Sequence, residues 1–222
     1  MMSDRTGSWI SAEVVAYAQG HAQDSTDEVL AWITAQSRSL GSVASMQIGS
    51  DQVAFMTILA KILHVRSAVE VGTFTGSSSL AIARGLAPGG RLLCCDMSEE
   101  WTAIAREAWA RAGVSDKIDL RLAPALDTLR SLPDDPTIDL AFVDADKSNY
   151  QRYIDEIIPR LRPGGLLLID NTIWSGRVVQ PTAPDDHDTA AIKAVNDALA
   201  ADTRVDSVLL TLGDGLSMAR KR

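Results

Sequence analysis

From Ser67 onward, short apolar runs alternate with helix-like segments, and this alternation limits the fold more than any other feature of the chain. The apolar runs are too short and too uniform to be amphipathic helices, and they predict buried parallel strands near 67–72, 91–96, 118–122, 138–144 and 165–170. The segments between them predict helices near 77–86, 99–112, 124–132 and 149–161. Clusters such as Pro88-Gly89-Gly90 and Pro163-Gly164-Gly165 separate the two kinds of segment. Such a chain is predicted to form an α/β fold, in which helices cover both faces of a parallel sheet.

Both ends of the chain depart from this alternation. Residues 1–45 form a predicted N-terminal helical extension, with a capping box at Ser25 and Glu28, and a further helix follows from Gly49 to about His64. A loop near 175–188 precedes a helix near 188–201. Two last strand candidates, Val205–Leu212 and Leu216–Ala219, flank Gly213-Asp214-Gly215, which suits a tight antiparallel hairpin. With no repeat or long linker, residues 1–222 are expected to be one domain with a mostly parallel seven-stranded sheet.

Composition excludes several functions. The chain has 222 residues and a formal charge of −8, which argues against nonspecific nucleic-acid binding by clustered basic residues. No apolar run approaches the roughly 20 residues that span a bilayer, so no membrane partner is expected. The first residues have no apolar segment of secretory type, and we expect a cytoplasmic protein. Cys94 and Cys95 are adjacent in a strand, point to opposite faces, and are expected to be buried thiols.

A glycine loop follows the first strand, in the segment from Glu70 to Ser78. Its spacing is Glu-x-Gly-x-x-x-Gly, and it differs from the G-x-G-x-x-G pattern of dinucleotide sites. A dinucleotide would place a pyrophosphate at the start of the following helix, where Glu70 would oppose it. The acid favours a cationic, phosphate-free ligand such as S-adenosylmethionine. The alternative is a glycine turn that packs a helix onto a strand, with Glu70 solvated.

Two further positions fit the same ligand. Asp96 ends the second strand, where an acid can accept hydrogen bonds from both ribose hydroxyls. Pro124-Ala125 begins the helix after the third strand, where an adenine edge would meet backbone groups.

Two other apolar runs end in oxygen-bearing side chains: one in Asp144, the other in Asp170 and Asn171. If the two strands are adjacent and parallel, these side chains emerge at the carboxyl edge of the sheet, where open α/β sheets bind ligands. Three oxygen donors predict a divalent-metal site, with Lys147 beside it as a base. Donors of this kind suit Mg²⁺ and argue against zinc, which prefers His and Cys.

Each of these residues has a structural alternative. Asp144 could cap the next helix, Lys147 could be a surface lysine, and Asp170-Asn171 could be a simple turn. Asp146 is expected to cap or pair locally, and His187 to lie in a solvated loop before a helix cap.

The chain resembles the class I S-adenosylmethionine-dependent O-methyltransferases, in particular the cation-dependent group that contains caffeoyl-CoA and catechol O-methyltransferases. The resemblance runs from about Met46 to the C-terminus. Its motifs are Glu70–Gly76, Gly113–Ile118, Ala123–Leu126, Phe142–Lys147, Asp170–Gly176 and Gly213–Gly215. The Phe-Val-Asp-Ala-Asp-Lys and Asp-Asn-Thr-Ile-Trp segments are specific to the group, whereas the glycine loop is shared by the broader methyltransferase class.

The resemblance implies a Rossmann-like methyltransferase fold and a role for each matching residue. Asp144, Asp170 and Asn171 would hold Mg²⁺ or another divalent cation such as Mn²⁺ or Ca²⁺, and Lys147, next to Asp144, would be the general base. Trp174 would border the acceptor pocket, and homodimers are common in the group. The S-adenosylmethionine site would be formed by Met46, Ile48, Glu70, Gly72, Thr73, Gly76, Ser78, Asp96, Ala125 and Asp144.

The implied reaction is methyl transfer to a hydroxyl of a small phenolic, catechol-like acceptor. Three other functions stay open: transfer to a non-catechol natural product, a nicotinamide dehydrogenase on a similar fold, and a dimeric S-adenosylmethionine-binding protein without turnover. The dehydrogenase gives no reason for Asp170-Asn171, and the inactive protein is expected to lack part of the metal set or the lysine. The loop from Arg177 to Asp188 is short and has no aromatic residue, which favours a small or varied acceptor.

Overall fold

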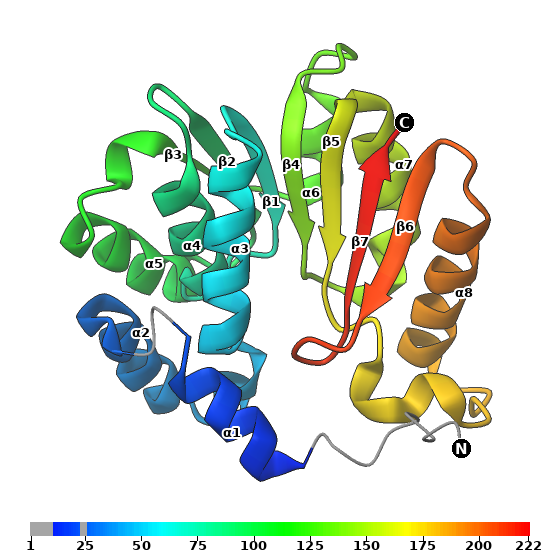
Figure 1. Cartoon of the computed structure of the whole chain (residues 1–222), viewed down its shortest axis with the longest axis horizontal. Coiled ribbons are helices and arrows are strands. Elements are labelled where there is room, and N and C mark those ends of the chain that lie inside the picture. Colours follow the sequence, from blue (N-terminus) through cyan, green and yellow to red (C-terminus); the bar gives the residue numbers. More distant parts are fainter. Residues whose placement is uncertain (1–10, 23–25) are drawn as a thin grey trace, which may run out of the picture.

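A seven-stranded sheet forms the centre of the computed structural model, which describes residues 11–22 and 26–222 (Figure 1). The strand order is β3-β2-β1-β4-β5-β7-β6. The strands are β1 (Ser67–Val71), β2 (Arg91–Asp96), β3 (Ile118–Leu122), β4 (Ile138–Val143), β5 (Leu161–Ile169), β6 (Val205–Leu210) and β7 (Leu216–Lys221). Strands β1 to β5 pair in parallel, and β7 pairs antiparallel with both β5 and β6. The predicted mostly parallel sheet with an antiparallel C-terminal hairpin is therefore confirmed.

Strand β5 begins earlier than the sequence predicts, at Leu161 and not near residue 165. Leu161 is opposite Ile138, but the next pair joins Leu140 to Leu166, so residues 162–165 form an irregularity inside the strand. Gly165 is needed there, because a Cβ would lie 2.8 Å from the Ile138 carbonyl oxygen. The Pro-Gly-Gly cluster thus deforms the start of the strand instead of preceding it.

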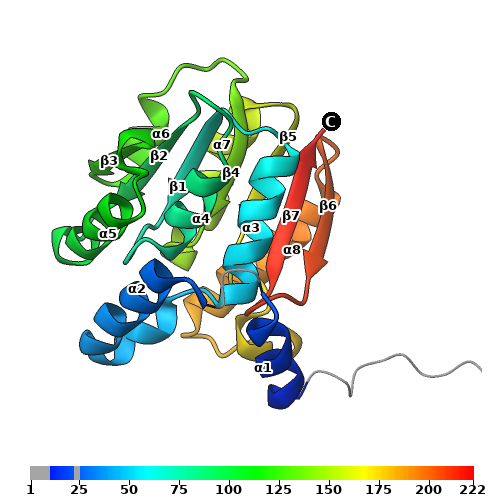
Figure 2. The ribbon, with the colours of Figure 1, turned by 60° about the vertical axis from the view of Figure 1, so that its left-hand side comes forward.

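Helices cover both faces of the sheet (Figures 1 and 2). The helices after the N-terminal region are α3 (Ser50–Ile62), α4 (Ser77–Gly85), α5 (Glu99–Arg111), α6 (Ala125–Arg130), α7 (Tyr150–Arg160) and α8 (His187–Ala201). Short 3-10 turns are η3 (Ser115–Lys117), η4 (Lys147–Asn149) and η5 (Trp174–Val179). Helix α8 begins at His187, one residue earlier than predicted, and the Asp186 side chain caps it by accepting a hydrogen bond from the Thr189 amide. The expectation that His187 lies in a loop before the helix cap is therefore wrong, because the cap precedes it.

The alternation of side chains along each strand creates two hydrophobic cores. In β4, Leu140 and Phe142 face the core shared with α3, α4 and α5, whereas Ala141 and Val143 face the core shared with α6, α7 and α8. Cys94 and Cys95 divide between these cores in the same way, and both are free and buried, as predicted. No helix in the described part of the chain is long and apolar enough to cross a membrane.

The N-terminal region lies at the edge of the sheet where the parallel strands end (Figures 1 and 2). It contains α1 (Ala12–Gly20), α2 (Glu28–Ser39) and the 3-10 helix η2 (Gly41–Met46). The helical prediction is confirmed for these residues. Asp27 caps α2 by accepting a hydrogen bond from the Leu30 amide at 2.9 Å. The predicted capping box is not described, because Ser25 lies outside the described residues.

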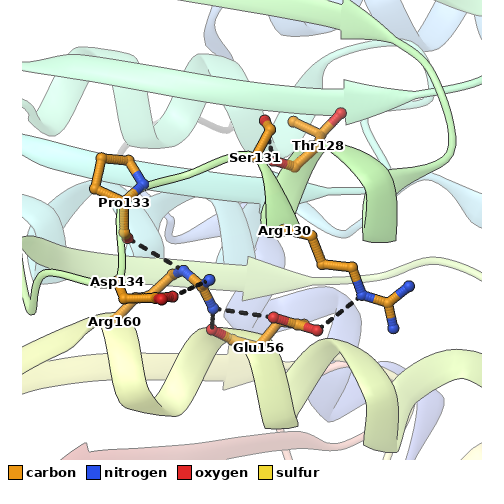
Figure 3. Close-up of polar contacts among 7 residues, drawn as sticks. All are labelled: Thr128, Arg130, Ser131, Pro133, Asp134, Glu156 and Arg160. Atoms are coloured by element: carbon orange, nitrogen blue, oxygen red, sulfur yellow. Dashed lines mark hydrogen bonds and ion pairs between the residues drawn. The ribbon is translucent and has the colours of Figure 1, made fainter.

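At the opposite edge, one buried arginine joins the loop before β4 to the end of α7 (Figure 3). Arg160 donates to the Pro133 carbonyl, to Asp134 and to both the carbonyl and the carboxylate of Glu156. Arg130 of α6 binds the same Glu156 at 3.0 Å. This network contains two cations and two acids, so its charges balance.

Candidate active site

A cavity of about 400 Å³ opens where β1, β2 and β4 end. Every residue predicted for the cofactor site lines this cavity except Glu70. The lining residues of that set are Met46, Ile48, Gly72, Thr73, Gly76, Ser78, Asp96, Ala125 and Asp144. The structure therefore brings together residues that are almost 100 positions apart, because parallel strands end at one edge of the sheet.

The glycine loop is shaped by two close approaches. Gly72 has φ +89°, and a Cβ there would lie 1.9 Å from the Asp144 carbonyl oxygen. Gly76 has φ +92°, and its Cβ would lie 2.8 Å from the Cβ of Ala105. Only glycine allows both the left-handed backbone and these contacts. The loop consequently lies directly against the end of β4, which carries Asp144.

Asp96 holds this loop in place with both carboxylate oxygens. Oδ2 accepts hydrogen bonds from the amides of Thr73 and Phe74, each at 2.9 Å. Oδ1 accepts from Met97 at 2.7 Å and from Ser98 at 2.8 Å. The acid predicted to bind ribose thus also fixes the backbone that surrounds the cavity.

Glu70 lies beneath the loop and not in the cavity wall. Its side chain is fully buried, and neither carboxylate oxygen has a hydrogen-bond partner among the described residues. Burial raises the pKa of Glu70 to about 7, while nearby Ser78, Cys94 and Thr73 lower it in part. The alternative with a solvated Glu70 is wrong. Because Glu70 does not line the cavity, its part in binding a cationic ligand stays a prediction.

Beside the cavity, Lys147 lies at the centre of a polar cluster. Its Nζ donates to Asp144 Oδ1 at 3.1 Å, to Asn171 Oδ1 at 2.6 Å and to the Tyr150 hydroxyl at 2.6 Å. Lys147 is only 8% exposed, so the alternative of a plain surface lysine is wrong. The predicted base and two of the predicted metal ligands are therefore in direct contact.

Asp170 completes the cluster from the end of β5. It is 2% exposed, and its Oδ1 accepts a hydrogen bond from the Asn171 amide at 2.8 Å. Burial, and then the charge of Asp144, raise the pKa of Asp170 to about 7. Burial also raises the pKa of Asp144, and the charge of Lys147 opposes this. The buried Asp170 and the partly exposed Asp144 therefore share one lysine, which leaves the cluster with more acids than cations.

These residues fit a hard divalent cation. Two carboxylates and one amide oxygen are donors that Mg²⁺, Mn²⁺ and Ca²⁺ prefer. A cation would also relieve the mutual repulsion of Asp144 and Asp170 that the pKa of Asp170 reflects. Across residues 11–22 and 26–222, no group of three or more His, Cys, Asp and Glu side chains is placed to hold a metal. This finding leaves the predicted set untested, because its third member is an asparagine.

A strained segment after β5 presents Trp174 to this cluster. Asn171, Trp174 and Ser175 have φ of 58°, 52° and 51°, the left-handed region that non-glycine residues seldom adopt. The turn between β6 and β7 holds the segment, since Asp214 accepts from the amides of Ile173 and Ser175. The Trp174 ring centroid lies 5.6 Å from Lys147 Nζ, so the tryptophan borders the cluster, and its role at an acceptor pocket stays a prediction.

Sequence reasoning missed several residues at the site. Asp146 and Tyr153 line the cavity, and Tyr153 donates to Asp146 at 2.6 Å, so Asp146 pairs locally and also faces the cavity. Tyr150 lies three positions after Lys147, a spacing that could have indicated its contact with the lysine. Gln52 binds Asp170 from α3, and no local pattern marks a contact across 118 positions.

Comparison with known proteins shows the family to which the chain belongs. A sequence model of the O-methyltransferase family matches residues 21–222. A probable caffeoyl-CoA O-methyltransferase of Dictyostelium discoideum is 39% identical over 175 residues, which cover 78% of this chain and 76% of the relative. The catechol O-methyltransferase domain-containing protein 1 of Mus musculus is 40% identical over 174 residues, covering 77% of this chain and 66% of the relative. The crystal structure of a Bacillus cereus O-methyltransferase in complex with SAH superposes with a TM-score of 0.84 at 28% identity, covering 94% of this chain and 97% of that one.

The fold and the cavity thus define a methyltransferase of the class that uses S-adenosylmethionine. The chain belongs to the O-methyltransferase family, and it is an S-adenosylmethionine-dependent O-methyltransferase. The family match begins at residue 21, well before Met46, so α2 belongs to the shared region.

Proposed function

We propose that this chain transfers a methyl group from S-adenosylmethionine to a hydroxyl of a small phenolic, catechol-like acceptor, in a reaction that needs a divalent cation. The observation that supports this most is the contact of Lys147 Nζ with Asp144 and Asn171, beside buried Asp170 and next to the cavity. The relatives named for caffeoyl-CoA and for catechol support a phenolic acceptor.

Asp144, Asp170 and Asn171 would hold the cation, for which Mg²⁺ is the first choice. A bound cation would supply a positive charge that lowers the proton affinity of the acceptor oxygens. Lys147 would take the hydroxyl proton at Nζ as the oxygen bonds to the methyl carbon and the bond from that carbon to sulfur breaks. Asp144 lines the cavity and also contacts Lys147, so it links the cofactor side to the reacting hydroxyl.

The cofactor would lie in the 400 Å³ cavity, with Met46 and Ile48 closing over it and Ala125 near the adenine. Trp174 would border the acceptor. The loop that follows it has no aromatic residue between Arg177 and Asp188, which supports a small or varied acceptor. Positioning of the two substrates would provide much of the rate enhancement.

A homodimer, a cytoplasmic location and a single domain over residues 1–222 are part of the same proposal. Exposed apolar side chains on α1 support the dimer, since Val14 is 49% and Tyr17 is 69% exposed. Light scattering after size exclusion would measure the mass, and a monomer at all concentrations would contradict the dimer.

The test is methyl transfer to a panel of catechols, with Mg²⁺ and then with EDTA. We expect turnover with Mg²⁺ that EDTA abolishes. Turnover that is indifferent to EDTA would leave Asp144, Asp170 and Asn171 without a metal role. Cofactor binding without turnover on any acceptor would favour a different acceptor or a binding protein.

A further inference from the structure

We propose that Gln52 is a positioning residue, which holds the Asp170 carboxylate in the orientation that binds the divalent cation. This inference rests on the proposed function and extends it to a residue on another element. Gln52 lies on α3, near its start, and is 1% exposed. Its Nε2 donates to Asp170 Oδ2 at 2.9 Å.

Two N–H groups from different parts of the chain determine the orientation of Asp170. The Asn171 amide binds Oδ1 from the strained segment, and Gln52 binds Oδ2 from α3. Each carboxylate oxygen can accept more than one bond, so both keep acceptor capacity for a cation. Within the described part of the chain, Gln52 is the only side chain that donates to the Asp170 carboxylate.

The chemistry of an amide suits this task. A lysine or arginine at position 52 would neutralise Asp170 and compete with a bound cation, whereas the amide donates a hydrogen bond and adds no charge. Removing the donor would leave Asp170 Oδ2 buried without a partner, and the carboxylate would be freer to rotate. Partners that orient metal ligands in this way typically change metal affinity when they are mutated.

The turn between β6 and β7 confines the Gln52 amide on its other side. A Cβ at Gly213 would lie 2.6 Å from Gln52 Oε1, so the glycine leaves room for the amide. The same turn holds Ile173 and Ser175 through Asp214. The turn therefore supports the position of Gln52 and the shape of the segment that carries Asn171.

The experiment is a titration of Mn²⁺ followed by electron paramagnetic resonance, on the wild type and on Gln52→Met, which keeps the length of the side chain and removes the donor. We expect the Kd for Mn²⁺ to rise about 10- to 100-fold. The Kd for S-adenosylmethionine, measured by calorimetry, is expected to stay unchanged, because Gln52 does not line the cavity in the described residues.

Thr57→Val is the matched control, since Thr57 is also buried on α3 and its hydroxyl bonds, among the residues that the structure describes, only to the Val53 and Ala81 carbonyls. It is expected to lower Tm and leave the Kd for Mn²⁺ unchanged, which would separate positioning from general destabilisation. In an Asp170→Asn background, Gln52→Met is expected to have no further effect on Mn²⁺ binding. An equal effect in both backgrounds would overturn the inference.

Gly213→Ala is the second variant if Gln52→Met does not fold, because its Cβ would displace the Gln52 amide. It is expected to weaken Mn²⁺ binding in the same way. If the wild type binds Mn²⁺ and the substituted protein binds it equally well, the role of Gln52 is overturned while the proposed function stands. If the wild type shows no saturable Mn²⁺ binding, the proposed function itself is overturned, and the role of Gln52 with it.

Discussion

Within the described part of the chain, each end of the sheet buries one cationic side chain, but the surroundings of the two side chains differ. Arg160 at the amino end is 6% exposed, and its two acids are balanced by Arg160 itself and by Arg130 (Figure 3). Lys147 at the carboxyl end is 8% exposed and shares its surroundings with Asp144 and Asp170, so one cation faces two acids.

The difference separates a structural network from a reactive one. Around Arg160, the guanidinium donates to carbonyls and carboxylates in a fixed fork, and the ion pair with Asp134 is exposed, since the Asp134 side chain is 93% accessible. Around Lys147, two acids face one cation, and burial together with this excess of acids raises the pKa of Asp170. Such an excess is costly in a purely structural site and suits one that takes up a cation.

The largest expected effect comes from removing an acid at the carboxyl end. Asp170→Ala is predicted to abolish cation-dependent turnover, because a ligand of the cation is lost, and to leave cofactor affinity unchanged, since Asp170 does not line the cavity in the described residues. Turnover and calorimetry would check both outcomes. Asp134→Ala is the control, because Asp134 pairs with Arg160 at the amino end of the sheet, and this variant is predicted to keep full turnover. Unchanged turnover in Asp170→Ala would remove this residue from the metal site.

Removal of the lysine is predicted to have the next largest effect. Lys147→Met is expected to lower kcat about 10²- to 10⁴-fold, the usual contribution of a general base. The loss is expected to be greatest at low pH, where a catechol with a pKa near 10 ionises least without help. Lys117→Met is the control, because Lys117 is also partly buried but donates to the Ala83 carbonyl, away from the site. A loss that is equal at every pH would indicate positioning and not base catalysis.

Removing Arg160 from the network at the amino end of the sheet is predicted to lower stability and to leave kcat unchanged. Arg160→Met removes bonds to the Pro133 and Glu156 carbonyls, and the free energy of unfolding is expected to fall by about 1–3 kcal/mol. For a chain of this size, Tm is expected to fall by about 2–4 °C for each kcal/mol. Calorimetry would measure this change, and kcat below the transition is predicted to match the wild type. A large loss of kcat at such a temperature would contradict the structural role.

Glu70 extends the comparison to a buried acid with no cation beside it. Its pKa is raised to about 7 by burial, from an ordinary value of 4.5, so its contribution to stability is complete below pH 4.5 and is lost as the pH rises through 7. Each pKa unit corresponds to about 1.4 kcal/mol. The Tm of Glu70→Gln, relative to that of the wild type, is therefore predicted to increase between pH 5 and pH 8 in EDTA. A Tm difference that does not change with pH would show that Glu70 is ionised at all these values.

The parallel strands of the fold and the acids at their carboxyl ends could be predicted from local sequence. Apolar runs followed by Asp96, Asp144 and Asp170 are features of neighbouring residues, and the rule that parallel strands end at one edge then placed the acids together. The glycine loop could also be predicted from neighbouring residues, because the Glu-x-Gly-x-x-x-Gly spacing lies within one strand-to-helix turn.

Other features depended on the tertiary structure. The sequence alone determined which residue types stand at the ends of the strands, since strand periodicity and side-chain chemistry are properties of neighbouring residues. Only folding decided that Lys147 contacts Asn171, that Gln52 binds Asp170 across 118 positions, and that Glu70 is buried without a partner. The reason is physical: hydrogen bonding and desolvation depend on distances between atoms and on exclusion of water, and both are properties of the packed molecule.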